Sequence, residues 1–158
     1  MTTKLTSFSI LTEPRGETYA ALIRVVSARA KTFGLVVRPG LGMSAAAEAA
    51  LRRLEPFLLL SEEAMKWPGT FLIDESATVF EYESTEITSV ILSQLANGLY
   101  EWKQPELPED LFFRRGDRST LLESIAHEET GSMYLDTEEF KAVTTKLPRL
   151  RLVLHENK

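Results

Sequence analysis

The sequence predicts a single α+β domain spanning residues 1–158, in which about four helices pack on a mixed or antiparallel sheet of roughly six to eight short strands. The length of 158 residues is typical of one domain, and 44% hydrophobic residues can fill one core. Apolar positions recur with the helical period in some segments and alternate in others. Consecutive hairpin patterns near residue 120 favour strand-to-strand connections over regular β–α alternation.

Most of the expected helices have a start or stop signal. Ser44 is a suitable N-cap for a helix that Pro56 must end, and Asp136 with Glu139 forms an aspartate version of the capping box. Gly34 has the position of a glycine that ends the first helix. In chain order we expect a strand at 7–11, a helix from 19 ending before Gly34, a strand at 35–37, a helix at 44–54, strands at 71–73 and 78–83, a helix at 85–96, strands at 111–114, 120–127 and 132–135, a helix at 136–147 and a strand at 150–154.

Two further segments are interpreted without regular periodicity. The apolar run 57–60 is expected to continue the core. Residues 99–109 form the most loop-like span, because prolines at positions 105 and 108 are incompatible with a regular helix or a central strand.

The composition excludes several classes of protein. The chain has no cysteine, so it has neither disulfides nor thiolate metal ligands nor a cysteine nucleophile. No apolar run approaches the roughly 18–20 residues that span a bilayer, and the first residues lack the apolar core of a secretion signal. We therefore expect a cytoplasmic protein without a membrane contact.

The net charge of −5 is unevenly distributed. Residues 61–110 carry eleven acidic and two basic side chains, whereas residues 1–40 carry two acidic and six basic ones. An acidic segment repels a phosphate backbone, so nucleic acid is not an expected partner. It would attract a basic protein, although a solvated acidic surface explains the same pattern.

The loop at 99–109 contains the first candidate site. Trp102 and Tyr100 lie close in sequence to Glu109 and Asp110, and tryptophan and tyrosine dominate protein interfaces. The loop is therefore a candidate acidic and aromatic contact surface. Aromatic side chains in a proline-containing loop can equally fill the core.

His127 is the second candidate. It ends a predicted strand and precedes two glutamates, and a histidine beside carboxylates can act as a general base. Arg114 or Arg115, across the hairpin, would anchor an anion there. Adjacent strand residues point to opposite faces, so only His127 and Glu129 could share a site. Two ligands are too few for a hydrolytic zinc site, so neither a metal nor a cofactor is expected. The alternative is a turn histidine with a local hydrogen bond.

Four blocks suggest a relationship to other proteins. They are Phe33 to Pro39, Trp67-Pro68-Gly69-Thr70, Leu107-Pro108-Glu109-Asp110-Leu111 and Ser124-Ile125-Ala126-His127-Glu128. The chain resembles a group of small bacterial proteins that carry similar blocks and have no known activity. The resemblance implies a bacterial origin and a shared fold, and it directs attention to these blocks.

Three functional hypotheses remain. The first is an interaction protein whose acidic, aromatic surface binds a basic protein, in the manner of an immunity protein that neutralises a toxin. The alternative is a ligand-binding domain or enzyme with a pocket around His127. The third is a structural subunit of a homodimer with an apolar isologous patch.

Overall fold

The antiparallel sheet organises the molecule. In this computed structural model, residues 3–151 and 154–157 are described. Eight strands are hydrogen-bonded in the order β10-β1-β9-β8-β7-β2-β6-β3, and every pair is antiparallel. The strands are β1 (Thr6–Ile10), β2 (Thr32–Val37), β3 (Leu58–Ala64), β6 (Ala77–Glu83), β7 (Glu109–Arg114), β8 (Thr120–Ile125), β9 (Thr130–Leu135) and β10 (Leu154–Glu156).

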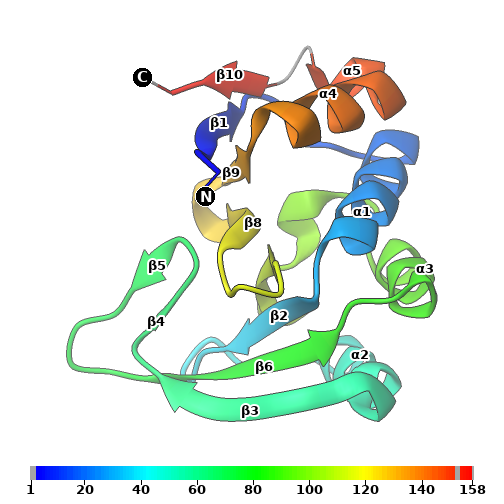
Figure 1. The fold of residues 1–158 in the computed structure, drawn as a ribbon. Helices are drawn as coiled ribbons and strands as arrows, with labels where there is room; N and C mark the ends of the chain where they lie inside the picture. Colours follow the sequence, from blue (N-terminus) through cyan, green and yellow to red (C-terminus); the bar gives the residue numbers. More distant parts are fainter. Residues whose placement is uncertain (1–2, 152–153, 158) are drawn as a thin grey trace.

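Five helices and a small hairpin accompany the sheet, which confirms the predicted single-domain α+β fold. The helices are α1 (Glu17–Arg29), α2 (Ala45–Leu54), α3 (Glu86–Leu95), α4 (Thr137–Lys146) and the short α5 (Pro148–Arg151). The hairpin of β4 (Lys66–Trp67) and β5 (Thr70–Phe71) extends to one side (Figure 1). No helix in the described ranges is long and apolar enough to span a membrane.

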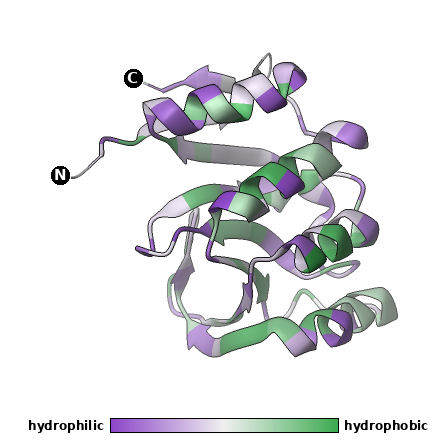
Figure 2. Ribbon diagram, turned by 45° about the vertical axis from the view of Figure 1, so that its right-hand side comes forward, coloured by the Kyte–Doolittle hydropathy of each residue, from purple (hydrophilic) through white to green (hydrophobic). Residues whose placement is uncertain are grey.

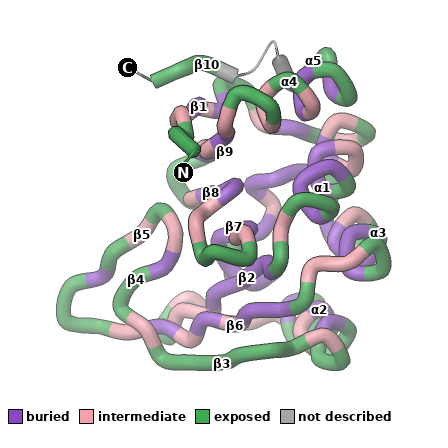
Figure 3. The backbone as a smooth tube through the Cα atoms, in the orientation of Figure 1, coloured by how far each residue is buried: buried purple, intermediate pink, exposed green. Residues whose placement is uncertain are grey.

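The two faces of the central strands contribute to two apolar clusters, because successive side chains of a strand point to opposite faces. The larger cluster contains one face of α1 and α3 together with residues such as Leu35 and Phe113. The smaller cluster contains Val36 and Phe112, and the hairpin adds Trp67 to it. Strands β2 and β7 are accordingly buried along most of their length (Figure 3).

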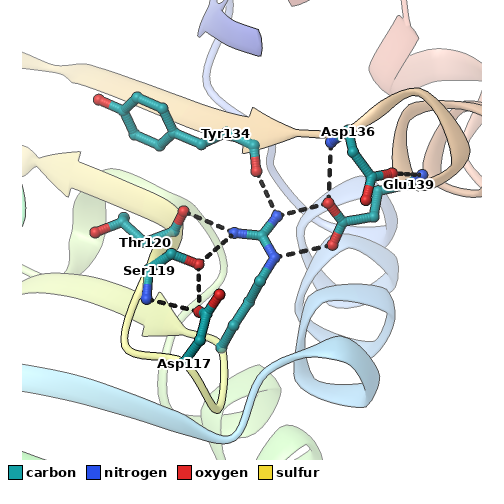
Figure 4. Close-up of polar contacts among 7 residues, drawn as sticks. Asp117, Ser119, Thr120, Tyr134, Asp136 and Glu139 are labelled. Carbon is teal, nitrogen blue, oxygen red and sulfur yellow. Dashed lines mark hydrogen bonds and ion pairs between the residues drawn. The ribbon is translucent and has the colours of Figure 1, made fainter. Parts of the chain in front are cut away.

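Arg115 connects α4 to the sheet through its contacts with Glu139 and Tyr134, two residues labelled in Figure 4. Its guanidinium donates two hydrogen bonds to the Glu139 carboxylate, at 2.7 and 3.0 Å, and others to the carbonyl oxygens of Tyr134 and Thr120. Glu139 also completes the predicted capping box with Asp136. One side chain therefore links the β7–β8 turn, the end of β9 and the first turn of α4.

Two local predictions were wrong. Gly34 lies inside β2 rather than at a helix end, and a Cβ built there would be 1.9 Å from Cζ of Phe112. The glycine thus permits close packing of an aromatic ring against the backbone. Residues 58–60 form part of the outer strand β3 and are exposed, and β6 is the one strand among the described residues that pairs with them.

The predicted final strand was also displaced. Residues Pro148–Arg151 form α5, and β10 pairs with β1 from Leu154 onward. Residues 152 and 153 of that prediction lie outside the described residues.

Candidate functional site

A polar pocket lies where three neighbouring strands of the sheet begin or end. Strand β7 runs antiparallel to both β2 and β8, so its first residues lie beside the last residues of those two strands. The β4–β5 hairpin lies across this edge. The resulting cavity of about 290 Å³ is lined by Arg38, Gly69, Thr70, Phe71, Glu109, Asp110, Ile125, His127 and Glu128.

Glu109 is the buried anchor of the pocket. Its side chain has no solvent exposure, and its Oε1 accepts a hydrogen bond from the backbone N–H of Gln104 and shares another with His127 Nε2 at 2.9 Å. Its Oε2 is also buried and has no hydrogen-bond partner among the described residues. Burial raises the pKa of Glu109, and the charge of Asp110 raises it further, against the lowering effect of Gln104 and His127.

His127 lies between this anchor and solvent. The side chain is 45% exposed and belongs to a short 3-10 turn, Ala126–Glu128, that follows β8. The Nε2 atom of His127 contacts Glu109. The other ring nitrogen, Nδ1, has no hydrogen-bond partner in the described part of the chain. Neither adjacent glutamate forms the pair that the sequence suggested.

Asp110 holds three segments together beside Glu109. Its Oδ2 accepts a hydrogen bond from Trp67 Nε1 at 3.0 Å, and its Oδ1 accepts one from the backbone N–H of Ala126 at 3.0 Å. Its φ of 55° lies in the left-handed region, which aspartate tolerates better than most residues. Burial raises the pKa of Asp110, although these two hydrogen bonds favour its ionised form.

Gln104 fixes the loop that borders the pocket. Its Oε1 accepts a hydrogen bond from the backbone N–H of Arg38 at 2.7 Å, and its Nε2 donates to the carbonyl oxygens of Gly42 at 2.8 Å and Arg38 at 3.2 Å. The side chain is buried. The sequence analysis did not identify this residue, since a glutamine in a loop has no distinctive signal.

Arg38, Thr70 and Phe71 also line the pocket and provide hydrogen-bond donors and apolar surface. Arg38 follows β2 and forms an ion pair of 3.0 Å with Glu75. The Thr70 hydroxyl is buried without a hydrogen-bond partner within the described residues. The Phe71 side chain, 69% exposed, lies at the pocket.

The contact surface predicted on the 99–109 loop does not form as expected. Trp102 is fully buried, and its Nε1 donates to the Tyr19 hydroxyl at 2.9 Å. Tyr100 is also buried in the main core. Glu109 and Asp110 point into the pocket rather than toward a partner, so the alternative interpretation of these aromatics as core residues is the correct one.

Arg114 does not belong to the pocket either. It lies at the opposite end of β7 from Glu109, on the order of 15 Å along the strand. There it contacts the Glu81 carboxylate at 3.4 Å and its guanidinium carbon lies 5.1 Å from the centre of the Phe112 ring. Arg115 connects α4 to the sheet and does not line the pocket either. The arginine that lines the pocket is Arg38.

All four blocks quoted for the resemblance contribute to this pocket, and the block Phe33 to Pro39 supplies Arg38. Trp67–Thr70 forms the hairpin wall, Leu107–Leu111 supplies the two buried carboxylates, and Ser124–Glu128 supplies the turn with His127. No cluster of three or more metal-ligating side chains occurs among the described residues. No protein-family model, curated protein or solved structure matches the chain.

Proposed function

We propose that this pocket binds a small polar molecule and that His127 exchanges a proton with it. The observation that carries the proposal is the pairing of a fully buried carboxylate, Glu109, with a half-exposed imidazole in a polar cavity. Burying a carboxylate costs several kcal/mol of hydration free energy. Titratable groups in such unfavourable surroundings are found most often at functional sites.

The arrangement suits general acid–base chemistry. A hydrogen bond at Nε2 orients the imidazole, and Nδ1 is then available to accept a proton from a bound molecule. The carboxylate also stabilises the imidazolium that results from this transfer. Arg38 and the Thr70 hydroxyl can contribute further polar contacts to the ligand.

The unpartnered Oε2 of Glu109 also supports a ligand-binding role. A buried acceptor without a donor costs about 1–3 kcal/mol, and a ligand that brings an N–H or O–H group to it would recover part of that cost. The ligand favoured by this geometry therefore has at least one hydrogen-bond donor. The cavity volume admits a molecule of metabolite size rather than a polymer.

Fragment binding observed by ¹H–¹⁵N NMR tests the proposal. We expect polar fragments to shift the amide signals of Thr70, Ile125 and His127, and we expect His127→Asn to weaken their binding by about tenfold or more. His155→Asn is the matched control, since it replaces the other histidine of the chain, in the exposed strand β10. A library without binders at these amides, or binding that His127→Asn leaves unchanged, would contradict the proposal.

A further inference from the structure

The outer strand β3 is open to pairing along its whole length. It hydrogen-bonds to β6 on one side, and the order of the sheet places no described strand on its other side. Six of its seven residues are exposed, and Figure 3 shows the strand as a continuous exposed edge of the molecule. Such an edge presents unpaired backbone N–H and C=O groups to any extended chain.

The first half of this edge is apolar. Leu58, Leu59 and Leu60 are 37%, 59% and 43% exposed, and a register shift between Leu58 and Leu60 marks a bulge. A shallow cavity of about 190 Å³ lies beside Leu58. It is lined by Leu51, Arg52, Glu55, Leu58, Phe80 and Tyr82. An added strand can place alternate side chains in such a cavity, which provides specificity beyond the backbone hydrogen bonds.

The second half of the edge is acidic. Glu62 and Glu63 follow the leucines, and Figure 2 shows the strand changing from hydrophobic to hydrophilic along its length. Between positions 55 and 75 the sequence contains five carboxylates and a single cation, Lys66. Arg114 and Arg118 interact electrostatically with Glu62 and share one carboxylate partner, Glu81, so this cluster carries a single net positive charge. Glu63 accepts hydrogen bonds from the neutral hydroxyls of Ser76 and Thr78. The carboxylates of this region therefore still outnumber the nearby cations.

The apolar and acidic halves of β3 together indicate which kind of chain would pair with this edge. We propose that β3 binds an extended segment of another protein as an additional antiparallel strand, with apolar residues opposite Leu58–Leu60 and lysine or arginine opposite Glu62 and Glu63. A second copy of this chain is a poorer match. A two-fold pairing centred on Ser61 would place two glutamates from each copy within a few residues of one another, and like charges at that separation repel.

Synthetic peptides test this proposal directly. The probe is a nine-residue peptide in which lysine and threonine alternate in the first half and valine and threonine in the second. One control peptide carries glutamate in place of each lysine. The other control peptide carries proline at alternate positions, and proline has no backbone N–H donor. We expect the lysine peptide to bind at low salt at least about tenfold more tightly than either control, by fluorescence anisotropy, and its affinity to fall as salt is raised.

A charge exchange locates the contact. The variant Glu62→Lys/Glu63→Lys should prefer the glutamate peptide, whereas Glu138→Lys, an exposed position on α4, should keep the preference of the wild type. Amide hydrogen exchange should show protection confined to β3 in the lysine complex. If the double variant does not fold, the peptide comparison and the exchange data decide alone.

Three outcomes would overturn the proposal. They are equal binding of all three peptides, an unchanged preference in a folded double variant, and protection of β3 in the absence of peptide. The last result, with a dimer mass by sedimentation, would assign the edge to a second copy of this chain instead. None of these outcomes depends on the His127 pocket.

Discussion

Glu109 and Glu81 are two buried carboxylates whose environments have opposite effects. Burial raises the pKa of Glu109. Burial also disfavours the ionised form of Glu81, but Arg118 donates hydrogen bonds of 2.7 and 3.0 Å to it and, with Arg114, lowers its pKa overall. A raised pKa in the folded state destabilises the fold once the group ionises, whereas a lowered pKa stabilises it.

Stability measurements across pH should therefore separate the two residues. The contribution of Glu109 to stability is present below its unfolded pKa, near 4.3, and is lost as the pH rises through its folded value. We expect Glu109→Gln to gain stability relative to wild type as the pH rises from about 4. Urea unfolding at a series of pH values measures this difference. A relative stability that stays flat or falls over this range would contradict the assignment.

Glu81→Gln should show the opposite trend. The stabilisation by Glu81 is present above its unfolded pKa and is lost as the pH falls through the lowered folded value. We expect the variant to be about 1–3 kcal/mol less stable at pH 7, because two arginines lose their charged partner. The same urea series should show this cost disappearing in acid, and a cost that persists there would argue for a packing effect instead.

Gly34 is required for its lack of a side chain. The substitution Gly34→Ala places a methyl group inside the van der Waals radius of the Phe112 ring, which is itself fully buried. We expect a loss of about 1–3 kcal/mol or more in the free energy of unfolding. Gly116→Ala is the control, since a Cβ there meets no atom within 4 Å, and it should change stability by less than about 0.5 kcal/mol.

At the scale of elements, the attachment of α4 depends on Arg115. Lysine cannot reproduce the two parallel hydrogen bonds to Glu139 together with those to the carbonyl oxygens. We expect Arg115→Lys to lower the thermal midpoint and the free energy of unfolding by about 1–3 kcal/mol. Arg24→Lys on the exposed side of α1 should be nearly neutral. Equal effects of the two substitutions would show that the Arg115 network contributes no net stability.

The sequence predicted most elements because their signals are local. The Ser44 cap and the Asp136–Glu139 capping box occur as expected, whereas the span 99–109, expected to be a loop, begins with a short 3-10 helix, Leu99–Glu101, and ends at Glu109 in β7. Positions that depend on distant neighbours were not predictable in this way. An apolar run such as Leu58–Leu60 does not reveal whether one or two strands pair with it. Of the strand expected at 71–73, only Phe71 lies in a strand, β5, which pairs with β4.

At the scale of the whole molecule, the pocket exists only because segments far apart in sequence meet. His127 was identified from its neighbours in sequence, but its partner Glu109 lies 18 positions earlier. Only the pairing of β7 with β8 brings the two together. The sequence therefore indicated the histidine and the carboxylates separately, whereas the arrangement that makes them a site required the antiparallel order of the strands.

The tautomer of His127 tests the central claim most directly. Long-range ¹H–¹⁵N correlation spectra distinguish the two ring nitrogens, and the chain has only one other histidine, the exposed His155, as an internal reference. We predict that neutral His127 carries its proton on Nε2, donated to Glu109, in a larger fraction than the exposed His155 does, and that Glu109→Leu lowers this fraction to the value of His155. A proton on Nδ1 in the wild type would contradict the account, because that nitrogen could not then accept a proton from a bound molecule.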